Sequence, residues 1–195
     1  MREAILISGL LTNSESWINV TRKDLEELEK PDTIMQRKIL SATGNPSKCF
    51  MQLEMGLIPV KYVIIQKRMN FLYYILHENK NSMIHQVYDA LKKDSRSGDF
   101  KALTDKDRKE LDIKYSDEDI EAFGKVAWKK YIKEKVTVAA LNYLVTENST
   151  KEKTKHIPFT ELKISDYLKH NISTVLSRII FSVRSQTLEI KTNRP

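Results

Sequence analysis

Five basic residues on helix-forming stretches have the types and spacing best suited to holding an anion. They are Arg37, Lys38, Lys61, Lys67 and Arg68. An arginine guanidinium presents a planar fork of N–H donors that matches a phosphate, and a lysine ammonium supplies a compact positive charge. Contacts of this kind grip the phosphate backbone of a nucleic acid without reading its base sequence. From the residues alone, the pattern favours phosphate binding at Lys67 and Arg68, and the other three belong to the same basic group.

Two further groups of basic residues accompany them. One contains Arg178 and Arg184 near the end of the chain, and the other is a run of lysines in a predicted helix: Lys125, Lys129, Lys130, Lys133 and Lys135. Most lysine-rich helix faces are simply hydrated surface, and we take that as the first interpretation of the run. Phosphate binding is the alternative for it.

The patterns that usually carry catalysis are missing from the sequence. The five glycines are too scattered for a phosphate-binding loop. No histidine pairs with another histidine or a cysteine at metal-ligand spacing, and Cys49 reads as a small buried hydrophobe. The acidic run at 117–119 opens a helix, where carboxylates complement the helix dipole. We therefore expect no catalytic residue, no metal site and no cofactor.

The longest amphipathic run, residues 56–78, must position the central basic residues. Gly56 suits the left-handed end of one helix, and Pro59 suits the start of the next. Apolar residues then recur at helical spacing and predict one buried stripe: Val60, Val63, Ile64, Met69, Leu72, Tyr73 and Leu76. Lys61, Lys67 and Arg68 fall outside this stripe, so we expect them to be available to an anion.

The remaining stretches also predict helices. Pro31 predicts a kink or a break near Lys30 in the helix that Thr21 caps. Ser116 and Asp119 resemble a capping box that opens one long helix reaching Leu144. The other expected features are helices at 4–11, 49–55, about 164–168 and 174–184, a helix capped by Ser82, a helix beginning near Phe100, and a polar linker at 147–155.

Composition agrees with a helical, nucleic-acid-associated protein. The 195 residues include only 5 glycines and 5 prolines, which disfavours a turn-rich β architecture and predicts an all-α fold. The formal net charge is +7, a balance that suits an anionic partner. A single cysteine fits a nuclear or cytoplasmic location. No apolar run approaches the roughly 18 residues of a membrane span.

Residues 53–78, LEMGLIPVKYVIIQKRMNFLYYILHE, resemble a segment of LINE-type non-LTR retrotransposon reverse transcriptases. That segment is the thumb, with the helical linker that follows it. Residues 3–32, 36–48 and 156–193 resemble neighbouring parts of the same region, whereas 92–155 match loosely. The aspartate-bearing palm motif and the zinc-knuckle ligands of the family have no counterpart in this sequence.

The resemblance implies a thumb-like helical bundle at 1–80, a helical linker region with a long helix at 81–147 and a smaller helical segment at 148–195. It implies a non-catalytic nucleic-acid-binding module that grips a template–primer duplex through Arg37, Lys38, Lys61, Lys67 and Arg68. The expected partners are an RNA–DNA hybrid or other duplex and the missing polymerase domains of the parent protein. No membrane and no small-molecule substrate are expected.

Two other interpretations stay open. The chain could be a helical protein–protein interaction module, or a non-functional remnant of a transposable element. Pairing of Lys61, Lys67 and Arg68 with acidic residues would make these cations structural and favour the protein–protein interpretation; the acids considered are Glu26, Glu27, Glu29 and Glu54. An enzyme of another kind is the least supported alternative, because no convergent site is visible.

Overall fold

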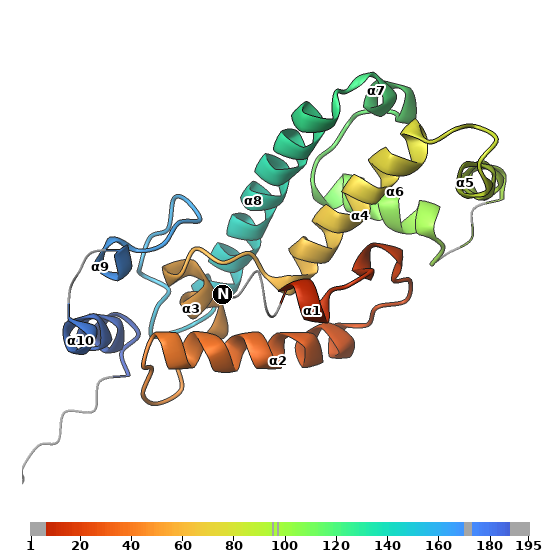
Figure 1. The fold of residues 1–195 in the computed structure, drawn as a ribbon. Coiled ribbons are helices and arrows are strands. Elements are labelled where there is room, and N and C mark those ends of the chain that lie inside the picture. The colour runs from red at the N-terminus through yellow and green to blue at the C-terminus, as the bar shows by residue number, and fades with distance from the viewer. Residues whose placement is uncertain (1–6, 95, 97, 170–172, 188–195) are drawn as a thin grey trace, which may run out of the picture. The chain divides into compact units, whose positions relative to one another are not determined.

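The computed structural model describes residues 7–94, 96, 98–169 and 173–187 (Figure 1). Of the described residues, 67% are helical, and they form ten α-helices and no sheet, which confirms the all-α prediction. In chain order, the elements are α1 (Ser8–Leu10), the 3₁₀ helix η2 (Ser14–Ser16), α2 (Arg22–Ile39), α3 (Lys48–Glu54), α4 (Val60–His77), α5 (Met83–Lys93), α6 (Phe100–Glu110), α7 (Asp117–Ala122), α8 (Lys125–Ser149), α9 (Asp166–Lys169) and α10 (Thr174–Arg184).

Side-chain caps set several helix starts, as their sequences predict. The Ser82 side chain accepts a hydrogen bond from the His85 N–H at the start of α5. Ser116 and Asp119 form the predicted capping box of α7. At the start of α2, the Asp24 N–H donates to Oγ1 of Thr21, the residue before the helix, over 3.2 Å. Each cap satisfies an amide that has no partner inside its helix.

Two predicted helix boundaries differ from the structure. The helix α2 runs unbroken from Arg22 to Ile39 with Pro31 inside it, so a break near Lys30 is wrong. Proline removes one backbone donor, and a long helix can survive that loss when it packs on both sides of the site. The predicted helix from Ser116 to Leu144 is two helices, because Phe123 adopts an extended conformation (ψ 139°) just before Gly124.

The chain forms two compact units, each discontinuous in sequence. The first comprises Met1–Leu28 and Val60–Ala139, and the second comprises Glu29–Pro59 and Ala140–Pro195. Both α2 and α8 contribute to each unit. The sequence predicts domain boundaries after residues 80 and 147, which separate sections of a parent polymerase. This division stays a prediction.

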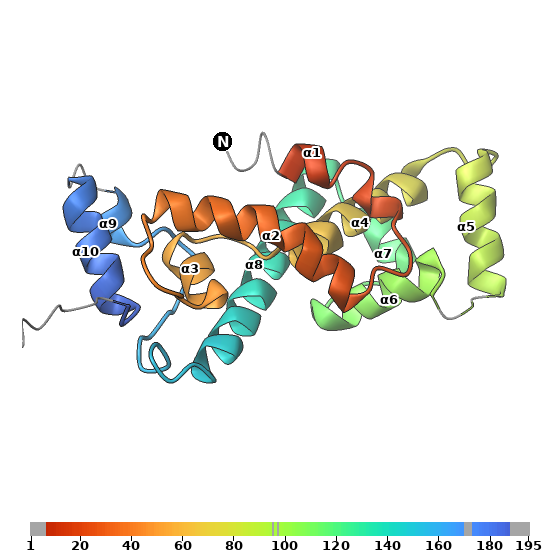
Figure 2. The ribbon, with the colours of Figure 1, turned by 90° about the horizontal axis from the view of Figure 1, so that it is seen from below.

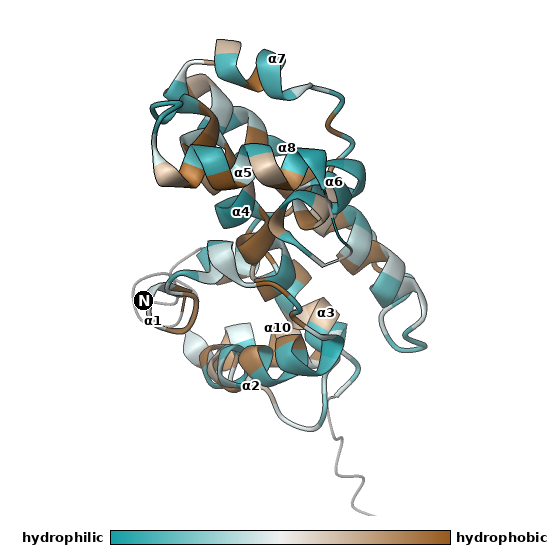
Figure 3. Cartoon of the chain, turned by 90° about the vertical axis from the view of Figure 1, so that its right-hand side faces the viewer, coloured by the Kyte–Doolittle hydropathy of each residue, from teal (hydrophilic) through white to brown (hydrophobic). Residues whose placement is uncertain are grey.

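In the first unit, α4 is the central element and contacts η2, α5, α6 and α7 (Figures 1 and 2). Its buried residues lie on more than the one predicted stripe, because they include Tyr62, Ile65 and Arg68. The Trp128 side chain of α8 is fully buried and donates from Nε1 to the Met69 carbonyl over 3.3 Å. Hydrophobic and hydrophilic positions alternate along the peripheral helix α5 (Figure 3).

The second unit packs α3 against α10 and the chain that leads to α9. Phe50 and Phe181, both fully buried, lie with ring centroids 5.9 Å apart. Cys49 is buried beside Leu53 and Leu144, which confirms its prediction as a small core residue. No described helix is long and apolar enough to cross a membrane.

Candidate nucleic-acid interface

The five predicted phosphate ligands divide between the two units. Arg37 and Lys38 end α2 in the second unit, whereas the other three lie on α4 in the first. The Arg37 Nη2 donates to Asn45 Oδ1 in the loop after α2, and its side chain is half-buried. Lys38 is exposed. Of this pair, Lys38 is the more exposed, and the Asn45 side chain that Arg37 contacts is a neutral amide.

The two lysines of α4 hold other parts of the first unit. Lys61 Nζ forms an ion pair with Glu110 of α6. Lys67 Nζ donates to the Leu11 carbonyl, which lies just after α1. Both side chains are half-buried rather than freely exposed. A phosphate could recruit them only by displacing a contact that stabilises the unit.

Arg68 is a core residue of the first unit, so the expectation that it is exposed is wrong. Its exposed fraction is 5%, and its Nη1 lies 2.6 Å from Asp107 Oδ2. Its Nη2 donates to the Trp17 carbonyl over 3.2 Å. Burial raises the pKa of Asp107 above its ordinary value although Arg68 opposes the shift. The Arg68 guanidinium is therefore occupied by contacts that stabilise the first unit.

The α8 helix carries a row of lysines that we call the lysine row: Lys125, Lys129, Lys130 and Lys133. All four are exposed, and none of their ammonium groups makes an ion pair or hydrogen bond with any described residue. Three of them recur every fourth residue, about 6 Å apart along the helix axis at 1.5 Å per residue. Trp128, Ile132 and Val136 are fully buried and fix which side of α8 faces the core.

Like charges stand next to one another in the lysine row. Lysines four apart on a helix repel each other by roughly 0.2–0.5 kcal/mol per pair. By contrast, the ammonium group of Lys135 has two contacts. It donates to the Asp112 carbonyl over 2.9 Å, and it lies over the ring of Tyr131. The row was visible in the sequence as an unassigned lysine run. What separates Lys135 from these four lysines is its contacts with Asp112 and Tyr131, which the sequence spacing does not indicate.

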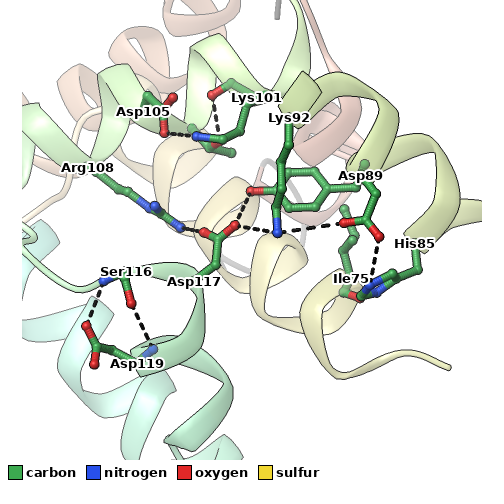
Figure 4. A network of polar contacts seen from close by, with 12 residues as sticks. Ile75, His85, Asp89, Lys92, Lys101, Asp105, Arg108, Ser116, Asp117 and Asp119 are labelled. Atoms are coloured by element: carbon green, nitrogen blue, oxygen red, sulfur yellow. Dashed lines mark hydrogen bonds and ion pairs between the residues drawn. The ribbon is translucent and has the colours of Figure 1, made fainter. Parts of the chain in front are cut away.

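The cations of α5 and α6 converge on a carboxylate of α7 (Figure 4). Asp117 accepts from Arg108 of α6, and Lys92 of α5 lies 2.9 Å from its Oδ2. The Tyr88 hydroxyl donates to the same carboxylate over 3.2 Å. Arg108 and Lys92 hold the pKa of Asp117 below its ordinary value although burial opposes them. This hub ties three helices together and gives both cations an acidic partner.

Replacing Asp117 with asparagine should lower the free energy of unfolding at pH 7 by about 1.5–3 kcal/mol, the range for hydrogen bonds to charged groups. Because the folded-state pKa lies below the ordinary 3.8, the contribution is present above that value and lost as pH falls through the folded pKa. Urea unfolding at pH 7 and pH 3 measures this. Asp94→Asn at an exposed site is the matched control, and an equal deficit at both pH values would contradict the assignment.

Comparison with models of protein families, with curated proteins and with solved structures finds no match to this chain. Within the described residues, no three His, Cys, Asp or Glu side chains gather where they could hold a metal ion.

Proposed function

We propose that this chain is a non-catalytic nucleic-acid-binding module that contacts phosphates through the lysine row of α8. The observation that carries the proposal is the set of four exposed lysine side chains within residues 125–133, none of which forms an ion pair with a described residue. Repulsion within the row is relieved when a polyanion binds. The net charge of +7 favours the same class of partner over the whole surface.

The origin of the module in a retrotransposon reverse transcriptase is part of the proposal. It is supported by four segments that resemble parts of such reverse transcriptases, residues 3–32, 36–48, 53–78 and 156–193. On this view the partner is an RNA–DNA hybrid or another duplex. The cations of α4 stabilise the first unit and are not part of the proposed contact.

If the chain contacts only phosphates, its binding should be weak and should not depend on the base sequence. Non-specific affinities of this kind correspond to dissociation constants of about 10⁻⁴–10⁻⁶ M at physiological salt. Four lysine–phosphate contacts give an affinity that falls about 150-fold between 50 and 200 mM salt on a duplex. Two RNA–DNA hybrids of unrelated sequence should bind equally well.

Replacing all four lysines of the row with glutamine should weaken binding of an RNA–DNA hybrid about tenfold or more at 50 mM salt, because each lost phosphate contact weakens binding uniformly across sequences. Fluorescence anisotropy of a labelled hybrid measures the change. The matched control replaces four exposed lysines elsewhere and removes the same charge: Lys23, Lys80, Lys93 and Lys153. Equal weakening by both variants would show a general charge effect and count against the row.

A second candidate function is a helical protein–protein interaction module. Two observations favour it. Lys61 and Arg68 form ion pairs with acidic residues of α6. An apolar row also lies on α10, where Val175, Ile179 and Val183 recur every fourth residue with exposed fractions of 67%, 44% and 54%. An amphipathic helix of a protein partner presents the same spacing. Serine at these three positions should leave hybrid binding unchanged if the lysine row is the functional surface.

A further inference from the structure

A cavity of about 120 Å³ lies within the first unit, between α4, α6 and the start of α2. On α4 and on α6 the lining residues are spaced by three, four and seven positions, so each helix turns one face to the cavity. Its apolar part is formed by five side chains: Val20, Leu25, Ile64, Ile65 and Leu103. Neither the lysine row nor the hub at Asp117 belongs to it.

The polar part of the cavity has one positive charge more than it has negative charges. Two ion pairs line it, Lys61 with Glu110 and Arg68 with Asp107. Lys106 also lines it, is exposed, and makes no ion pair with any described residue. Arg68 Nε is buried and lacks a hydrogen-bond partner among the described residues. An added monoanion would balance the charges and give Lys106 a partner.

We propose that this cavity binds a small carboxylic acid, as its anion, that carries a compact branched alkyl group. The alkyl group would fill the apolar part, and the carboxylate would lie at the rim beside Lys106. An apolar cavity of about 150 Å³ accommodates benzene, so a cavity of 120 Å³ suits a group of four or five carbons. This ligand site is independent of the proposed nucleic-acid function.

Nuclear magnetic resonance of the ¹⁵N-labelled chain, titrated with isovalerate, tests the proposal. Shifts should concentrate on the amides of Ile64, Ile65 and Leu103 and should saturate with a dissociation constant on the order of 1–10 mM, as expected for a ligand of this size. The neutral isostere isovaleramide should bind about tenfold more weakly, because it lacks the charge that pairs with Lys106. Equal binding of the two compounds, or no localised shift, would overturn the proposal.

Two variants and a control separate the two parts of the site. Lys106→Gln should weaken isovalerate about tenfold and leave isovaleramide unchanged. Val20→Phe, in the segment before α2, should fill the cavity and abolish both responses. Lys109→Gln removes a neighbouring exposed charge of α6 that does not line the cavity, and it should bind like the native chain. Unchanged affinity in Lys106→Gln would contradict the assignment of the carboxylate.

Discussion

Replacing Asp107 with alanine should lower the free energy of unfolding by about 3–5 kcal/mol, because it leaves the Arg68 guanidinium buried without its counter-ion. The pair lies within the first unit with both side chains almost fully buried and 2.6 Å between Nη1 and Oδ2. An arginine cannot discharge itself by losing a proton. Urea unfolding followed by circular dichroism measures the loss.

The reciprocal variant Arg68→Met should lower the free energy of unfolding by less than Asp107→Ala does. The loss should be smallest at acidic pH. Burial already raises the pKa of Asp107, so the orphaned carboxyl can take up a proton instead of staying charged. The double variant Arg68→Met, Asp107→Leu should return to within about 1 kcal/mol of the native chain, since apolar replacements of buried pairs are often neutral. A small loss in Asp107→Ala would show that Arg68 can reach water and could meet a phosphate after all.

Replacing Gly56 with alanine should destabilise the second unit by about 3 kcal/mol or more. Gly56 has φ +61°, a left-handed conformation that costs an L-residue roughly 1–2 kcal/mol. A Cβ atom there would also lie 2.5 Å from the Lys163 carbonyl carbon, which belongs to backbone and cannot swing away. The two causes act together, so the expected loss exceeds that of the conformation alone.

The contact next to Gly56 gives a local readout of this variant. The Ser165 N–H donates to the Glu54 carbonyl over 2.8 Å, and Met55 pairs with Ile164 as an isolated β-bridge. Exchange of the Ser165 amide with deuterium should accelerate in Gly56→Ala. Gly124→Ala is the matched control, because a Cβ there meets nothing within 4 Å and φ is not positive. Normal protection of Ser165 in Gly56→Ala would contradict the close approach.

Local signals in the sequence predicted most helix starts and ends. Glycine at the left-handed position after α3, serines that cap α5 and α7, and apolar spacing along α4 and α10 act within one turn of helix. The boundary at Gly124 was missed because the apolar periodicity continues across it. The break at Pro31 was overpredicted because tertiary packing can outweigh one lost hydrogen bond.

The fate of the basic residues could not be read from periodicity. Arg68 lies outside the apolar stripe, yet Asp107, 39 positions further along the chain, draws it into the core. Lys61 is likewise paired with Glu110. Neither Asp107 nor Glu110 is one of the four glutamates named as possible partners in the sequence. Such pairings depend on which helices become neighbours. The ammonium groups of the lysine row, by contrast, form no ion pair with any described residue.

The salt dependence of hybrid binding tests the lysine row most directly. A plot of log affinity against log salt concentration should have a slope of about −3.6 for the native chain on a duplex, from four phosphate contacts. The variant with glutamine at Lys125, Lys129, Lys130 and Lys133 should have a slope near zero, and the charge-matched control should keep the native slope. A native slope in the lysine-row variant would contradict the account and place the contacts elsewhere.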